Sequence, residues 1–284
     1  MSSKLKEIIE KIADLPSMPD VAFEVMREVD NPTANALTVS NVLARDPSLS
    51  ARVLQLANSA YYGMPREVAS IRGAIVLLGM RTVKSLSLVA ATFPWLQKAM
   101  QGKGVDPDYL WNHSLAVAFV SRAIARATGT VNPEQAFCIG VLHNLGIVVL
   151  CTLKEADVLA LAQMQDGSDT PFTIVEESAF GFNHADLGAA LVESWNLPEA
   201  YSDAIRHHHN PDLATRNVMF ADILHLADTL VRNADIDEGL GNLVFQVSEH
   251  SASRLGLEPD VIEQVAESAF LELNGSGKIF QQVA

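Results

Sequence analysis

Helical periodicity between proline and glycine breakers runs along nearly the whole chain and constrains it more than any other feature. Apolar side chains recur with helical rather than alternating spacing in almost every segment. Alanine, leucine and glutamate also outnumber the β-branched and aromatic residues that strands prefer. We therefore predict an all-α protein, folded as a multi-helix bundle.

Breakers in the sequence also predict helix starts and a domain boundary. Asp46 precedes Pro47 in "RDPSLS", which is typical of an N-cap carboxylate followed by a proline in the first helical position. Two glycines and a proline in "QGKGVDP" interrupt the helical pattern near residue 104. We predict an N-terminal helical subdomain over residues 1–104 and a helical core with C-terminal helices over residues 105–284.

The individual helices are predicted from the spacing between breakers. They cover residues 4–14, 19–30, 47–63, two short helices hinged near Gly79 and ending before Pro94, then 108–127, 133–153, 154–165, 171–180, 184–195, 198–209, one after Pro211, and 259–273. The segment "NGSGK" that follows is expected to be a frayed tail.

Composition narrows the location and the partners. A net charge of −14 disfavours nucleic acid, because lysine and arginine supply most of the affinity for phosphates. No apolar run reaches the roughly 18 uncharged residues of a membrane-spanning helix, and "MSSKLKEIIEKIADL" reads as an amphipathic helix rather than a signal peptide. We expect a cytoplasmic protein with no membrane contact. Cys138 and Cys151 lie in apolar sequence and are expected to be buried thiols.

Histidines are concentrated in the second half of the chain, several beside apolar helical runs. A single histidine in such a run is more often a core residue than a ligand. Their order is more informative, because a histidine, a His-Asn pair, a histidine, a histidine group and an aspartate on separate predicted helices can converge in a bundle core. These residues are His113, His143, Asn144, His184, the triplet His207, His208 and His209, His225 and Asp228.

This order, together with several longer stretches, resembles the HD superfamily of metal-dependent phosphohydrolases and, more closely, its HDOD branch. The resemblance implies an all-helical module of bacterial signal transduction and regulation, acting through contacts with signalling proteins or through self-association. The stretches that carry it are "LPSMP", "ARDPSLSARVLQLANSAYYG", "IRGAIVLLG", "LHNLG", "GFNHADLGAALVESWNLP" and "AIRHHH", which span residues 15–211, roughly 70% of the chain.

The resemblance also implies positions for metal ligands. Two imidazoles and a carboxylate are adequate ligands for one divalent first-row ion (Fe, Mn, Ni or Zn), although we expect no cofactor to be required. Carried over residue by residue, the ligand positions fall on His113, His143, Asn144, His184, His207 or His208, and Asp228.

Three departures from the pattern disfavour catalysis. Asn144 stands where HD enzymes have their central aspartate, and a neutral amide cannot supply a bridging anion. Ile147 takes the place of the lysine in the "HDIGK" stretch of HD-GYP phosphodiesterases, and the HHE...GYP signature is absent after His209. We therefore expect no catalytic residue and favour a non-catalytic regulatory module.

Two other functions remain open. One is a metal-dependent phosphohydrolase or phosphodiesterase with a degenerate site, acting on a nucleotide or cyclic nucleotide, because five of the six ligand positions can still bind a metal. A nucleotide ligand also remains open for a non-catalytic module. The other is a DNA-binding regulator, because the segment 71–89 has two short helices around Gly79 with Arg72, Arg81 and Lys84 nearby, as in a helix-turn-helix.

Overall fold

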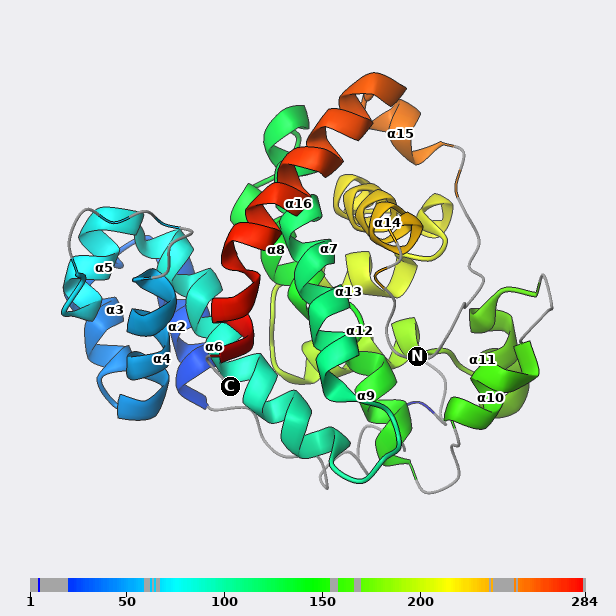
Figure 1. Ribbon diagram of the computed structural model, residues 1–284, viewed down its shortest axis with the longest axis horizontal. Helices are drawn as coiled ribbons and strands as arrows, with labels where there is room; N and C mark the ends of the chain where they lie inside the picture. The colour runs from blue at the N-terminus through cyan, green and yellow to red at the C-terminus, as the bar shows by residue number, and fades with distance from the viewer. Residues whose placement is uncertain are drawn as a thin grey trace. The chain divides into compact units, whose positions relative to one another are not determined.

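The structure is a computed structural model that describes residues 5, 20–58, 62, 64, 67–153, 158–165, 170–234, 236, 248 and 250–282. Within these residues all regular structure is helical, and no strand occurs (Figure 1). The prediction of an all-α protein is confirmed. The helix predicted over residues 4–14 lies outside the described residues except for Leu5.

The chain divides into two compact units. The small unit contains Ser17–Trp95 and Phe270–Ala284, and the large unit contains Met1–Pro16 and Leu96–Ala269. The predicted domain boundary at residue 104 stays a prediction.

Helix caps in the small unit follow from local sequence. The side chain of Asp46 accepts the backbone N–H of Leu49 at 2.9 Å with Pro47 in the first turn, as predicted. Asn35 caps α3, a helix that we did not predict. The helices of this unit are α2 (Asp20–Asp30), α3 (Ala36–Leu43), α4 (Pro47–Ala57), α5 (Ile71–Leu78) and most of α6 (Met80–Met100).

Helix α4 ends at Ala57, earlier than the predicted end at Gly63. The side-chain amide of Asn58 donates to the carbonyl oxygens of Leu54 at 2.9 Å and Val68 at 3.0 Å. Its carbonyl oxygen accepts the backbone N–H of Val68 at 2.7 Å. The asparagine therefore ends the helix and holds a residue ten positions later beside it.

Helix α6 runs through Pro94, so the prediction that a helix ends before this proline was wrong. Proline has no N–H and deprives the carbonyl four residues earlier, that of Ala90, of its helical donor. The Nε of Arg52 donates to this carbonyl oxygen at 2.9 Å instead. A side chain from α4 thus supplies the hydrogen bond that the proline removes.

Two glycines allow helices of the large unit to approach closely. A Cβ added at Gly140 of α8 would lie 2.5 Å from Cα of Ala118 on α7. A Cβ added at Gly146 of α9 would lie 1.8 Å from the carbonyl oxygen of His184, the first residue of α12. These contacts bring the backbones of four helices close together, and the histidines of the site lie on or next to these helices. The helices are α7 (Pro107–Thr128), α8 (Pro133–Leu142), α9 (Leu145–Thr152) and α12 (His184–Ser194).

Helix α15 (Ser251–Arg254) was not predicted. The other helices agree with the predicted segments except at three places. The predicted helix over residues 133–153 is broken at His143 and Asn144. A short 3-10 helix, Pro211–Leu213, precedes the helix expected after Pro211. The last helix continues through the segment expected to fray. The remaining helices are α10 (Val158–Gln165), α11 (Phe172–Phe180), α13 (Glu199–His207), α14 (Val218–Asn233), α15 (Ser251–Arg254) and α16 (Pro259–Gln282).

One segment, Pro133–Thr152, is apolar and long enough to cross a membrane, so the expectation that no run has this length was wrong. Burial covers 89% of its apolar window, as in the core helices of globular proteins, and a single segment of this kind is weak evidence for a membrane span. The same segment carries both cysteines, and both are buried thiols, as predicted. Burial raises the pKa of the Cys151 thiol to about 12.

Candidate metal centre

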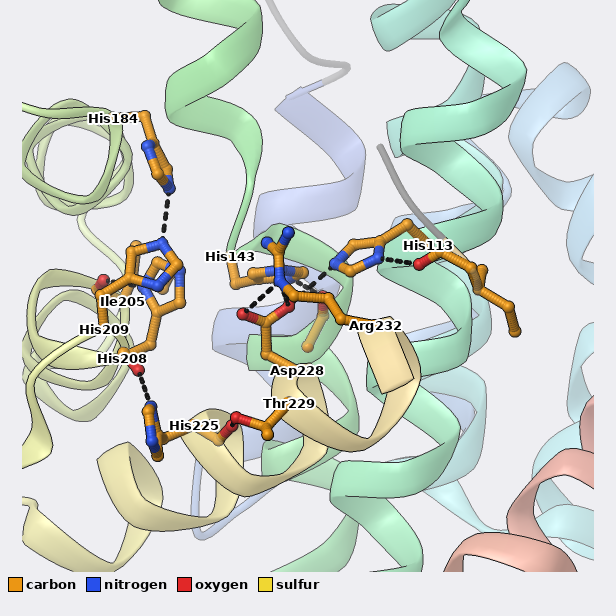
Figure 2. Close-up of polar contacts among 12 residues, drawn as sticks. His113, His143, His184, Ile205, His208, His209, His225, Asp228, Thr229 and Arg232 are labelled. Atoms are coloured by element: carbon orange, nitrogen blue, oxygen red, sulfur yellow. Dashed lines mark hydrogen bonds and ion pairs between the residues drawn. The ribbon is translucent and has the colours of Figure 1, made fainter. Parts of the chain in front are cut away.

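His113, His143 and Asp228 meet in the core of the large unit and form what we call the first cluster (Figure 2). One ligand atom from each lies within 4.8 Å of the others. Nε2 of His113 is 2.9 Å from Oδ1 of Asp228, and Nε2 of His143 is 3.8 Å from the same oxygen. Helices α7 and α14 and the break between α8 and α9 therefore supply one ligand each.

Backbone carbonyls orient both histidines of the first cluster. Nδ1 of His113 bonds to the carbonyl oxygen of Ile236 at 2.8 Å, and Nδ1 of His143 bonds to that of Gly140 at 2.7 Å. A carbonyl can only accept, so each Nδ1 carries a proton and each Nε2 faces Asp228. Nε2 of His143 is buried and has no hydrogen-bond partner among the described residues.

Arg232 neutralises the carboxylate of the first cluster. Its Nε lies 3.2 Å from Oδ1 and 3.1 Å from Oδ2 of Asp228, one helical turn earlier on α14. Burial opposes ionisation of Asp228, but the Arg232 guanidinium and the hydrogen bond with His113 outweigh burial and hold the pKa of Asp228 well below its usual value. The first cluster therefore contains a carboxylate that already has a cationic partner.

His184, His208 and His209 form the second cluster, also within 4.8 Å of one another. Nε2 of His184 is 2.8 Å from Nε2 of His209. Nδ1 of His208 bonds to the carbonyl oxygen of Ile205 at 2.6 Å, and its buried Nε2 has no hydrogen-bond partner among the described residues. The rings of His143 and His208 are 5.3 Å apart, so the two clusters are adjacent.

Burial keeps His143, His208 and His209 neutral. It lowers the pKa of His143 to about 3 and holds the pKa values of His208 and His209 well below the usual value for histidine. Nearby histidines lower the last two values further. Neutral imidazole is the form that binds a metal ion.

The residues present fit a metal ion in each cluster, on the evidence of their own hydrogen bonds. Two buried nitrogen lone pairs, on His143 and His208, lack a hydrogen-bond donor among the described residues. Such atoms cost free energy in a dry interior unless a cation or a proton binds to them. A first-row ion would have His113, His143 and Asp228 as ligands in the first cluster and three imidazoles in the second. When bound, such an ion acts as a Lewis acid.

Most of the predicted ligand residues are brought together by the fold. Asn144 is buried at the start of α9, next to His143, and makes no capping hydrogen bond through its side chain. His207 lies apart from both clusters, with Nε2 3.7 Å from a carboxylate oxygen of Asp203. The metal-ligand roles assigned from the sequence stay predictions.

Three residues of the site were missed in the sequence. His209 joins His208 in the second cluster, although only His207 or His208 had been predicted as a ligand, and the triplet was its signal. Arg232 lies four residues after Asp228, a spacing that indicates an ion pair on a helix. No sequence pattern indicates Glu176 as a site residue, because its contact with His184 spans the turn between α11 and α12.

Several known proteins are similar to this chain in sequence or structure. An uncharacterized protein of Treponema pallidum (strain Nichols) is 28% identical over 204 residues, which are 72% of this chain and 39% of the relative. The cyclic di-GMP phosphodiesterase CdgJ of Vibrio cholerae serotype O1 is 27% identical over 137 residues, which are 48% of this chain and 30% of the relative. This chain therefore spans well under half of these curated relatives.

A solved structure from Shewanella amazonensis SB2B, provisionally named a phosphohydrolase, has a TM-score of 0.78 and 28% identity, and the match covers 100% of this chain and 99% of that one. The HDOD domain family model matches residues 15–211, the range over which the sequence resemblance was seen. This chain belongs to the HDOD domain family.

Proposed function

We propose that the protein is a non-catalytic regulatory module of bacterial signal transduction that acts through protein–protein contacts. The observation that carries this proposal is the pairing of Asp228 with Arg232 at 3.1 Å, in a site where Asn144 stands in place of a second carboxylate. Hydrolysis by two metal ions depends on a clamp of anionic ligands around both ions. Here the one carboxylate of the first cluster is already neutralised.

Burial of the ligand side chains also supports a regulatory role. His113, His143, His184 and His208 have no exposed surface, and Asp228 is 3% exposed. A phosphodiester would have to reach these side chains to be hydrolysed. A partner protein that binds to the surface outside the clusters does not need access to these side chains.

The test is a hydrolysis assay with the purified full chain, loaded with Mn²⁺, Fe²⁺ or Zn²⁺. Cyclic di-GMP and bis-p-nitrophenyl phosphate are the substrates, and His143→Ala is the matched control. The expected result is that the two proteins have the same low rate. Metal-stimulated turnover that disappears in His143→Ala would exclude the non-catalytic proposal.

A metal-dependent phosphohydrolase is the second candidate. It is favoured by the two buried Nε2 lone pairs of His143 and His208, which lack a hydrogen-bond donor among the described residues. The CdgJ relative is a cyclic di-GMP phosphodiesterase, but only 30% of its length aligns with this chain. Elemental analysis of protein purified without chelator tests the hydrolase candidate, since metal-free protein would remove it.

Nucleic acid is a weaker candidate partner. Among the three basic residues of the segment 71–89, Lys84 is buried and its Nζ lies 2.6 Å from a carboxylate oxygen of Asp30. Such a side chain does not face a phosphate backbone. A mobility shift of duplex DNA that weakens with salt would revive the DNA-binding alternative.

A further inference from the structure

Glu176 on α11 is a fully buried carboxylate beside the second cluster. Among the described residues its ion-pair partner is His184, and its Oε1 accepts no hydrogen bond from them. Burying a carboxylate without a compensating positive charge is costly. A positive charge close to His184 would therefore stabilise the buried carboxylate.

Both hydrogen bonds from His184 to Glu176 fix the orientation of the histidine. Oε2 of Glu176 accepts Nδ1–H at 2.7 Å and the backbone N–H of the same residue at 3.2 Å. With Nδ1 donating to the carboxylate, the neutral ring carries its lone pair on Nε2. A carboxylate in this position raises the basicity of the imidazole and strengthens its bond to a metal ion.

The Nε2 atoms of the second cluster converge as a result. Nε2 of His184 faces Nε2 of His209 at 2.8 Å. His208 adds a third Nε2, whose lone pair is fixed by the bond of Nδ1 to the carbonyl of Ile205. Three imidazoles with an oriented carboxylate behind one of them suit a single first-row ion.

The two clusters differ in how their carboxylate is neutralised. In the first cluster Arg232 lies 3.1 Å from Asp228 and places a positive charge beside the ligands, which repels a metal ion. In the second cluster the described residues give Glu176 no lysine or arginine partner. A divalent cation therefore gains more electrostatic free energy in the second cluster.

We propose that Glu176 is a positioning residue that makes the second cluster the tighter of the two cation sites, for one divalent first-row ion. Glu176 acts through His184 and is not itself a ligand. The proposal holds whether or not the protein hydrolyses a substrate, so its failure would leave the proposed regulatory function standing.

The test is a Co²⁺ titration of the full, metal-free chain, followed by the visible absorption of the bound ion and by elemental analysis. Wild type should bind one Co²⁺ tightly. Glu176→Gln keeps the size and the hydrogen-bond acceptor but removes the charge, and should weaken this site by about 10- to 100-fold. Asp228→Asn, which removes a carboxylate from the adjacent first cluster, should weaken the site less than Glu176→Gln does. Glu263→Gln, at an exposed position on α16, is the matched control and should bind as wild type does.

Three results would overturn the proposal. They are the absence of Co²⁺ binding, equal affinity in Glu176→Gln and wild type, and a greater loss of affinity in Asp228→Asn than in Glu176→Gln. Circular dichroism of each metal-free variant checks its fold. If Glu176→Gln does not fold, His209→Gln replaces it, and retention of the tight site in that variant would contradict the assignment to the second cluster.

Discussion

Nε2 of His113 on α7 lies 2.9 Å from Oδ1 of Asp228 on α14. Because Nδ1 of His113 donates to the carbonyl of Ile236, a neutral His113 would present a lone pair to a carboxylate. The contact therefore requires a second proton on the ring or a cation held by both groups.

Replacing Asp228 should test how much this charge arrangement stabilises the fold. Asp228→Asn leaves the Arg232 guanidinium, which is 16% exposed, without its carboxylate, and should lower the free energy of unfolding by about 3 kcal/mol. Asp186→Asn is the matched control, because Asp186 pairs with Arg206 at 3.2 Å but is 33% exposed, and it should cost less than about 1 kcal/mol. Urea denaturation of both variants measures the difference, and equal losses would contradict the role assigned to burial.

Stability of the metal-free protein should fall as the solution becomes acidic. The pKa of His143 is lowered by burial from 6.5 to about 3, so between these values the unfolded chain binds a proton that the folded chain does not. His208 and His209 shift in the same direction. Each such histidine contributes a slope of about 1.4 kcal/mol per pH unit, with stability lost as the pH falls below about 6.5.

Urea denaturation at about pH 7.5 and about pH 5.5 measures this loss. His143→Gln should reduce the slope of stability against pH by the contribution of one histidine, about 1.4 kcal/mol per pH unit. Equal stability of the wild-type protein at the two pH values would contradict the burial of neutral imidazoles.

Gly146 should not tolerate a side chain. A Cβ at this position would lie 1.8 Å from the carbonyl oxygen of His184, a backbone atom that cannot rotate away. Gly146→Ala should cost about 3 kcal/mol or more and disturb the second cluster through His184. Gly73→Ala in α5 is the control, because its nearest neighbour would be the flexible Oγ of Ser70 at 3.2 Å. Thermal melting should show a loss for the first variant and a change within about 1 kcal/mol for the second.

Restoring the carboxylate next to His143 should increase the affinity for metal. Asn144→Asp places an anion in a buried position, so it should lower the stability of the metal-free protein and raise the affinity for a divalent ion by tenfold or more, roughly 1.4 kcal/mol. Elemental analysis and metal-induced shifts in melting temperature measure both effects. If the affinity does not rise, residue 144 does not face the metal ligands.

Several features of the fold could be predicted from the sequence because they depend on residues that are close together in the chain. Helical periodicity gave the all-α class, and the carboxylate of Asp46 before Pro47 gave the start of α4. The break at His143 and Asn144 was missed, because the apolar run continues on both sides and periodicity does not report a change of helix direction. The passage of α6 through Pro94 was missed for another reason, since it depends on Arg52 from a different helix.

The sequence by itself determined the helical class, most helix boundaries and the order of histidines and aspartate, because caps, breakers and periodicity act over a few residues. The tertiary structure alone decided that His209 and not His207 joins the second cluster, that Arg232 neutralises Asp228, and that Glu176 orients His184. These contacts depend on how closely helices approach, as at Gly146 against the backbone of His184. Distances between helices arise from the packing of the whole unit, and no local pattern encodes them.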